Sequence, residues 1–128
     1  MRALLDTHTL AWWLLNDRRL SQSALRIVAD PANEIWVSAV SAFETATKYR
    51  IRKWNDIRDL AIGFEAAVVA EGFEMLSILA KHASRGGILQ GTHRDPFDRL
   101  LAAQSLIEDM PIVTNDPAFR AFGVETLW

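Results

Sequence analysis

The sequence contains no cysteine. Disulfide bonds, cysteine-ligated zinc and a cysteine nucleophile are therefore excluded. Long apolar runs are also missing: nothing approaches the roughly 18–20 consecutive apolar residues of a transmembrane helix, and the start has no signal-peptide core. We expect a cytoplasmic protein that does not enter a membrane.

A marked excess of one charge is lacking too, since 14 Lys and Arg residues face 16 Asp and Glu residues, for a formal net charge of −2. The molecule as a whole does not attract nucleic acid, so such binding would need a local basic patch. Half of the 128 residues are hydrophobic, which is ordinary for a globular protein. At this length we expect one domain over residues 1–128.

Short β-like runs alternate with helical stretches along the chain. The expected strands are 3–5, 34–37, 73–78, 111–114 and 124–128. The expected helices are 10–15, 21–29, 41–51 (or from 38), 59–71, 79–85, 96–108 and a short one from 116, with Gly86 and Gly87 in a loop. This alternation predicts an α/β sandwich around a mostly parallel sheet of four or five short strands, with ligands beyond the carboxyl ends of the strands.

Two acids follow short apolar strands. Asp6 comes directly after the run Ala3-Leu4-Leu5, and Asp116 comes shortly after Ile112-Val113. If the two strands are parallel neighbours, both carboxylates emerge at the same edge of the sheet. Each acid also has a simpler interpretation as a helix N-cap, and Asp116, which precedes a proline, fits that role well.

Glu44 lies in the stretch SAFETATKYRI. Ser41-x-x-Glu44 fits a capping box, and Glu44 followed by Lys48 fits an ion pair one helical turn apart. On a helical wheel, however, Glu44 falls at the edge of the apolar stripe that contains Val40 and Ile51. An ionised acid there costs several kcal/mol unless it is paired or binds a cation.

The stretch HRDPFDRLLAAQSL carries Asp95 and Asp98. Asp95 before Pro96 fits an N-cap, and Asp98 then falls in the first turn, where the helix dipole favours a carboxylate. The rest of this helix is apolar over most of its circumference, so we expect it to be buried with its first-turn acid facing the cleft. One such acid is a weak signal, but four acids where their elements meet the same edge are harder to explain as caps.

Four stretches, LLDTHTLAWWLL, VSAVSAFETATK, HRDPFDRLLAAQSL and IVTNDPAF, resemble in order and spacing the acidic motifs of PIN-domain ribonucleases. More narrowly, the chain resembles the VapC toxins of bacterial VapBC toxin–antitoxin pairs. The resemblance covers the whole chain and implies a PIN-like three-layer sandwich. It also implies a metal-dependent endoribonuclease that uses Mg²⁺ or Mn²⁺ to cleave tRNA or another structured RNA. The family acids fall on Asp6, Glu44, Asp98 and Asp116.

The resemblance implies a role for each of these acids. Asp6 and Asp98 would bind the main ion, Asp116 would bind a second ion or act through water, and Glu44 would hold a metal-bound water. The physics agrees, because clustered carboxylates repel one another without a cation, and hard divalent ions prefer oxygen ligands. The sequence does not choose between one ion and two.

Other residues are expected to support the site. Asp95 is an additional ligand or only a helix cap, and the hydroxyls of Thr7 and Thr114 are placed to contact the substrate or the water around the ion. His8 adjoins Asp6, but a lone histidine is more often packed or hydrogen-bonded than catalytic. We therefore interpret His8 as a packing residue.

A basic run follows Glu44, and two arginines lie beside the other acids. We expect these residues to contact RNA phosphates: Lys48, Arg50, Arg52, Lys53, Arg94 and Arg99. The alternative for the run is a solvated helix end whose cations suit the dipole. Trp54 could stack on a base, although a place in the core or an interface is the simpler interpretation.

The VapC resemblance also implies partners. They are a VapB-like antitoxin that covers the active site and a second copy of the chain, in a homodimer or a toxin–antitoxin hetero-oligomer. The adjacent residues Trp12 and Trp13 cannot place both rings on one helix face, so one is expected at an interface unless both pack within the monomer.

Three alternative functions are considered. A haloacid-dehalogenase-type phosphotransferase, another Mg²⁺-dependent domain, also has an aspartate after its first strand, but its second aspartate would fall on His8. A response-regulator receiver domain would need a paired acid that is not evident. A catalytically inactive PIN-like module that only binds RNA or protein would keep the fold without the activity.

Overall fold

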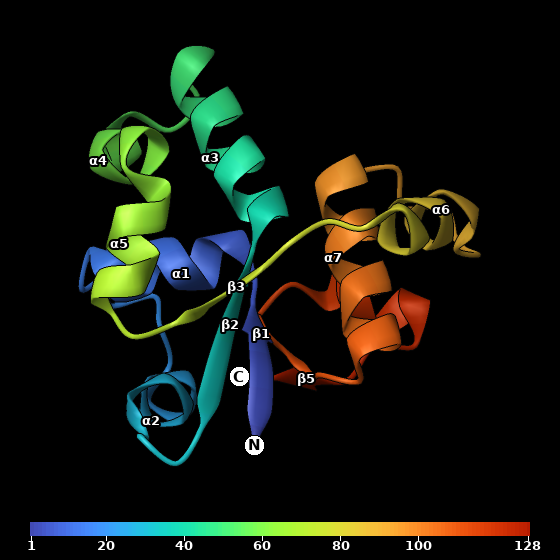
Figure 1. The fold of residues 1–128 in the computed structure, drawn as a ribbon, viewed down its shortest axis with the longest axis horizontal. Helices are drawn as coiled ribbons and strands as arrows, with labels where there is room; N and C mark the ends of the chain where they lie inside the picture. The colour runs from blue at the N-terminus through green and yellow to red at the C-terminus, as the bar shows by residue number, and fades with distance from the viewer.

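A five-stranded parallel sheet runs through the centre of the computed structural model, which describes all 128 residues (Figure 1). The strand order is β3-β2-β1-β4-β5. The strands are β1 (Arg2–Leu5), β2 (Glu34–Ser38), β3 (Glu74–Leu76), β4 (Ile112–Val113) and β5 (Thr126–Leu127). The predicted α/β fold with a parallel sheet is confirmed.

Helices connect the strands. The α-helices are α1 (Thr7–Leu14), α2 (Gln22–Ala29), α3 (Ala39–Arg50), α4 (Arg58–Ile62), α5 (Phe64–Ala70), α6 (Ala80–Ile88) and α7 (Pro96–Glu108). The 3-10 helices are η1 (Asn55–Ile57) and η2 (Pro117–Phe122). None of these helices combines the length and the apolar character that crossing a bilayer requires.

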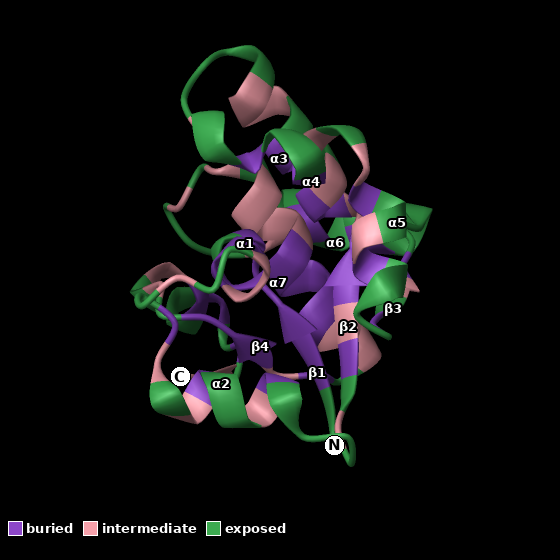
Figure 2. Cartoon of the chain, turned by 90° about the vertical axis from the view of Figure 1, so that its left-hand side faces the viewer, coloured by how far each residue is buried: buried purple, intermediate pink, exposed green.

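Alternate residues of β1 face two different helical layers. Ala3 and Leu5 are buried in a cluster with residues of α1, α2, α4 and α5, whereas Leu4 is buried with residues of α7 and η2. Side chains alternate across a strand, so a strand covered on both faces must be apolar throughout. Figure 1 shows α7 on the opposite side of the sheet from α1, α2 and α5, and Figure 2 shows the central strands buried between the layers. The predicted three-layer sandwich is therefore confirmed.

Glycine positions account for two differences from the sequence-based prediction. The segment 59–71, predicted as one helix, is divided into α4 and α5 at Gly63. Gly86 and Gly87, predicted to lie in a loop, are helical residues of α6. A Cβ on Gly86 would lie 3.1 Å from the backbone oxygen of Arg99, so glycine is what lets α6 approach α7 this closely.

The start of α3 agrees with the earlier of the two predicted positions. Its N-cap is Ser38, whose hydroxyl accepts a hydrogen bond from the Val40 N–H over 3.0 Å. Ser41 lies inside the helix with its hydroxyl 2.8 Å from that of Thr7. The predicted capping box between Ser41 and Glu44 is therefore wrong, because the N-cap lies three residues earlier and both side chains are buried within the helix.

The two adjacent tryptophans of α1 lie on different faces of the helix, as helical periodicity requires. Trp12 is buried in the core, while the half-buried Trp13 donates its indole N–H to Glu71 Oε2 over 2.9 Å. Both rings are thus engaged within the chain. Packing within the monomer, one of the two alternatives, is therefore observed for both rings.

Candidate metal-binding site

One small hollow at the carboxyl end of the sheet is lined only by polar and charged residues. Its lining residues are Asp6, Thr7, His8, Glu44, Lys48, Asp95, Asp98 and Asp116. The five acids among them come from the turn after β1, the middle of α3, the start of α7 and the turn after β4. All four acids that the sequence singled out, and the additional Asp95, therefore meet in one place.

Strand register places Asp6 beside Thr114. Leu5 pairs with Val113, so the residues that directly follow them lie side by side. The Thr114 hydroxyl donates a hydrogen bond to Asp6 Oδ2, and the Thr9 N–H donates to Asp6 Oδ1 over 2.7 Å. Asp6 therefore caps α1 and lines the hollow at the same time, so the two interpretations of this residue are compatible.

Asp116 also caps a helix and lines the hollow at the same time. Its carboxylate accepts a hydrogen bond from the Ala118 N–H over 2.9 Å and caps η2, as the Asp-Pro pair predicts. Its own N–H donates to Thr114 Oγ1 over 3.0 Å. Thr114 thus links the two acids that follow neighbouring strands, and its hydroxyl is directed at Asp6.

Glu44 is almost inaccessible to solvent, with 3% of its surface exposed. Its Oε1 accepts a hydrogen bond from the Thr7 hydroxyl over 2.6 Å, and its Oε2 accepts one from Lys48 Nζ over 2.6 Å. The helical wheel correctly placed this carboxylate toward the core. The predicted i,i+4 ion pair is also present, and it accounts for how a charged acid is tolerated there.

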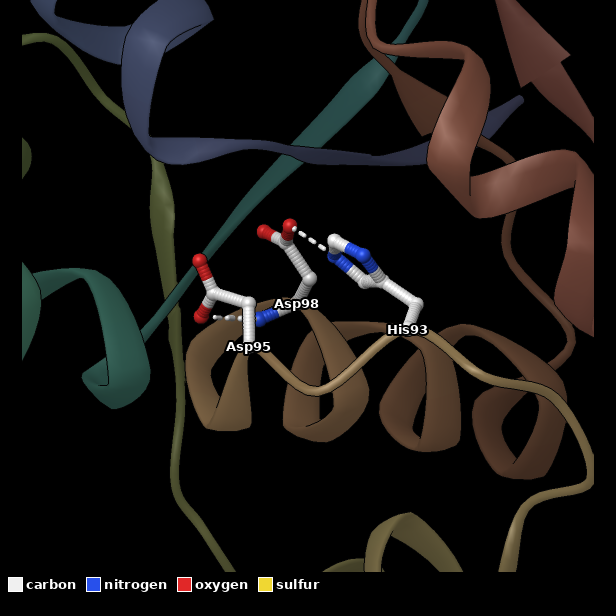
Figure 3. Close-up of side chains that lie close together, drawn as sticks. All are labelled: His93, Asp95 and Asp98. Atoms are coloured by element: carbon white, nitrogen blue, oxygen red, sulfur yellow. Dashed lines mark hydrogen bonds and ion pairs between the residues drawn. The ribbon is translucent and has the colours of Figure 1, made fainter.

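The carboxylate of Asp98 is hydrogen-bonded to His93, a residue that the sequence did not indicate as part of the site. His93 Nε2 lies 2.7 Å from Asp98 Oδ2 (Figure 3). Asp95 caps α7, since its Oδ1 accepts hydrogen bonds from the N–H groups of Phe97 and Asp98. Ligand atoms of His93, Asp95 and Asp98 all lie within 4.8 Å of one another. The only advance sign was the spacing His-x-Asp-Pro-x-Asp, which puts an imidazole two residues before the cap.

Negative charge accumulates in this hollow. Burial raises the pKa of Asp6. The pKa of Asp98 rises to about 6, first through burial and then through the charges of Asp95, Asp116 and Glu44. The only Lys or Arg that lines the hollow is Lys48, which is paired with Glu44. A concentrated set of carboxylate oxygens with too few cations fits a hard divalent ion such as Mg²⁺ or Mn²⁺.

The basic residues expected to contact RNA differ in solvent exposure and in their contacts within the chain. Four of them are exposed and form no ion pair within the chain: Arg50, Arg52, Lys53 and Arg94. Lys48 lies in the hollow itself, and its Nζ is 5.9 Å from the centre of the Trp54 ring. Trp54 in turn stacks on His8, with ring centroids 4.7 Å apart and 22° between the planes. His8 therefore contacts Trp54 but remains exposed, and it also lines the hollow.

Arg99 is occupied within the chain. Its Nε donates to the Gly86 carbonyl and its Nη1 to the His93 carbonyl, each over 2.8 Å, and its Nη2 contacts the Leu89 carbonyl. The guanidinium also lies over the Phe122 ring, 5.4 Å from its centroid. Unlike the four exposed cations, this side chain is not free to hold a phosphate.

Comparison with known proteins decides the family. The family model for the PIN domain matches residues 3–125. The chain belongs to the PIN-domain family. This PIN domain is similar to Ribonuclease VapC22 of Mycobacterium tuberculosis, with 29% identity over 129 residues that span 92% of this chain and 89% of that protein.

Solved structures support the same fold. One is VapBC2 from Rickettsia felis bound to a DNA fragment from their promoter, which has a TM-score of 0.66, 18% identity and coverage of 99% of this chain and 98% of that one. Another is FitAcB from Neisseria gonorrhoeae, with a TM-score of 0.67, 17% identity and coverage of 100% and 97%. The resemblance to PIN domains and VapC toxins that the motifs indicated is confirmed.

Proposed function

We propose that this PIN domain is a metal-dependent endoribonuclease that acts as the toxin of a toxin–antitoxin pair. The observation that carries the proposal is the convergence of Asp6, Glu44, Asp98 and Asp116 on one polar hollow. The similarity to Ribonuclease VapC22 supports RNA as the substrate. We infer that the substrate is tRNA or another structured RNA.

The carboxylates of Asp6, Asp98 and Asp116 would hold Mg²⁺, or Mn²⁺ in its place. When bound, the ion activates water for attack on the phosphodiester and stabilises charge on the leaving oxygen. Asp6 is kept in one orientation by the Thr9 N–H and the Thr114 hydroxyl. A carboxylate that is already fixed loses little conformational freedom when it binds an ion.

Glu44 would orient the attacking water. Each of its oxygens accepts one hydrogen bond from the chain, which leaves a further acceptor site on each oxygen for water. Thr7 and Lys48 prevent the side chain from turning away from the hollow. Their hydrogen bonds satisfy both oxygens of this buried carboxylate.

The exposed basic residues would hold the RNA. Arg50, Arg52 and Lys53 follow Glu44 along α3 and the turn after it, whereas Arg94 precedes Asp95. Local cations are needed for this binding because the net charge of the chain is −2. The toxin–antitoxin complexes among the structural neighbours support a VapB-like antitoxin as the partner and a dimer or hetero-oligomer as the assembly.

Exchange of Asp6 for asparagine tests the proposal. An asparagine oxygen can still accept the hydrogen bond of the Thr9 N–H, so Asp6→Asn keeps the cap of α1 while it removes the charge. We expect loss of Mg²⁺-dependent RNA cleavage and of growth arrest on expression, with circular dichroism unchanged. Asp59→Asn is the matched control, because Asp59 is fully exposed.

Two results would contradict the proposal. Unchanged cleavage and toxicity in Asp6→Asn would exclude the acid hollow as the active site. RNA binding without Mg²⁺-dependent cleavage by the wild-type chain would favour the alternative, a PIN-like module that binds RNA or protein without acting on it.

A further inference from the structure

The carboxylate of Asp98 relies on a single partner. Asp6 and Glu44 each accept two hydrogen bonds from the chain, whereas Asp98 accepts one, from His93 over 2.7 Å. An ionised carboxylate can only accept hydrogen bonds, so the Nε2–H of His93 is the donor. Without His93, no other group of the chain would fix the orientation of this carboxylate.

His93 lies outside the hollow that the acids line. It lines a neighbouring hollow together with Gly91, Thr92, Arg94 and Arg99. Asp98 belongs to the acid hollow, and Figure 3 shows its carboxylate between Asp95 and the imidazole ring. Asp98 Oδ2 is therefore hydrogen-bonded to the imidazole ring. Asp98 Oδ1 is the oxygen that remains available to an ion in the acid hollow.

The main chain of His93 is itself held in place. Residues 90–94 have no regular secondary structure, so main-chain hydrogen bonds of a helix or strand do not fix them. The Arg99 guanidinium bridges this segment to α6, because it donates to the carbonyls of both His93 and Gly86 over 2.8 Å. The His93 ring also lies against Phe122, with centroids 6.0 Å apart.

We propose that His93 is a positioning residue that acts through Asp98. Its Nε2–H holds Asp98 Oδ2 so that Oδ1 faces the acid hollow, and Arg99 fixes the main chain from which the imidazole reaches Asp98. The inference rests on the proposed function in one respect, namely that Asp98 binds the ion. Loss of a partner that orients a ligating carboxylate typically weakens metal binding about 10–100-fold.

A different role for His93 makes a different prediction. The imidazole, Asp95 and Asp98 lie close enough together to be considered as three ligands of one ion. Imidazole suits transition metals better than Mg²⁺, which prefers oxygen. A ligating His93 would therefore favour Mn²⁺ over Mg²⁺, whereas a positioning His93 affects both ions alike.

Ion binding to the full chain without RNA tests the inference. Mn²⁺ binding is followed by electron paramagnetic resonance, and Mg²⁺ binding by its competition with Mn²⁺. We expect His93→Phe to weaken both ions by the same factor, about 10–100-fold. His93→Gln restores most of the affinity, because its amide N–H replaces the lost donor. Thr92→Val, a change at an exposed position of the same loop, leaves both affinities unchanged.

A double variant shows whether His93 acts through Asp98. In the Asp98→Asn background, His93→Phe should have little further effect on ion binding, because two residues in one interaction are not additive. In cleavage assays with the wild-type aspartate, His93→Phe should raise the Mg²⁺ concentration for half-maximal rate and leave the rate at saturating Mg²⁺ nearly unchanged. A variant that merely misfolds would lose rate at every Mg²⁺ concentration.

Several results would overturn the inference. They are unchanged affinities in His93→Phe, a loss confined to Mn²⁺, a failure of His93→Gln to restore binding, and full additivity with Asp98→Asn. A wild-type chain that binds neither ion would instead refute the proposed function, and the inference with it. The wild-type titration therefore separates the two failures.

Discussion

The hydroxyl of Thr7 lies 2.6 Å from Glu44 Oε1 and ties the first turn of α1 to the middle of α3. Both side chains are buried. Because Thr7 donates its single hydroxyl hydrogen to Glu44, the Ser41 hydroxyl, 2.8 Å away, donates to Thr7. A line of hydrogen bonds therefore runs through the core from Ser41 to the acid hollow and fixes the carboxylate of Glu44.

Thr7→Val should weaken the fold through this line. The valine keeps the shape of threonine but leaves a buried carboxylate oxygen without its donor, so the free energy of unfolding should fall by about 1–3 kcal/mol. Urea denaturation measures the loss. Thr7→Ser, which keeps the hydroxyl, should retain most of the stability, and equal losses in the two variants would assign the effect to packing instead.

Lys48→Met should destabilise the chain in the absence of divalent ions. The substitution leaves Glu44 buried without its cation. Removing one partner of a fully buried ion pair lowers the unfolding free energy by about 3–5 kcal/mol. Lys48 is partly exposed, so the expected loss is about 1–3 kcal/mol. Removal of the positive charge should strengthen Mg²⁺ binding, so Mg²⁺ should raise the melting temperature more in the variant than in wild type.

Lys53→Met is the matched control for this experiment, since Lys53 is exposed and unpaired. Its unfolding free energy and its response to Mg²⁺ should equal those of wild type. A Lys48→Met chain that is as stable as wild type in EDTA would show that Glu44 does not need the cation.

Stability in EDTA should fall as the pH rises from 4 to 6. The pKa of Asp98 is raised from its ordinary 3.8 to about 6, so in this window the folded chain keeps a proton that the unfolded chain releases. Folding then binds protons, and the unfolding free energy drops with pH, by about 1–3 kcal/mol in total from this group. The raised pKa of Asp6 adds a change of the same sign.

Asp98→Asn isolates this contribution. The variant should lose part of the pH slope and should be more stable than wild type at pH 7 in EDTA, although it binds Mg²⁺ poorly. Urea denaturation at several pH values measures both effects. A slope that is identical in the variant and wild type would contradict the raised pKa of Asp98.

Two neighbouring glycines of α6 should respond to alanine with opposite signs. Gly87→Ala meets nothing within 4 Å and should raise the unfolding free energy by about 0.5–1 kcal/mol through helix propensity. Gly86→Ala would press its Cβ on the backbone of Arg99 at 3.1 Å, and the overpacking should cost about 1–3 kcal/mol. Thermal melting of both variants checks this, and stabilisation by both would show that α6 can move away from α7.

The acids of the hollow could be found from the sequence because their positions follow from chain topology. A residue that directly ends a buried parallel strand must emerge at the carboxyl edge of the sheet, as Asp6 does. The burial of Glu44 followed from helical periodicity. Local rules also gave the exact span of α7, because an Asp-Pro pair marks its first residue.

Tertiary contacts account for what the sequence did not reveal. A pair of glycines normally indicates a loop, and only the neighbouring α7 explains why Gly86 is helical here. The pairing of His93 with Asp98 depends on the path of an irregular loop, which no periodicity predicts. The carbonyl of His93 in the same loop accepts a hydrogen bond from Arg99. The position of Arg99 beside Asp98 in the sequence had indicated a phosphate contact instead.

The irregular segment 90–94 gives the molecule unequal resistance to heat. The sheet and its helices form one packed body, while this loop depends on a few side-chain contacts, chiefly those of Arg99. Segments of this kind open locally at a lower free energy than the global transition. Gentle warming should therefore release Asp98 from His93 while the strands remain paired, and such inactivation should reverse on cooling.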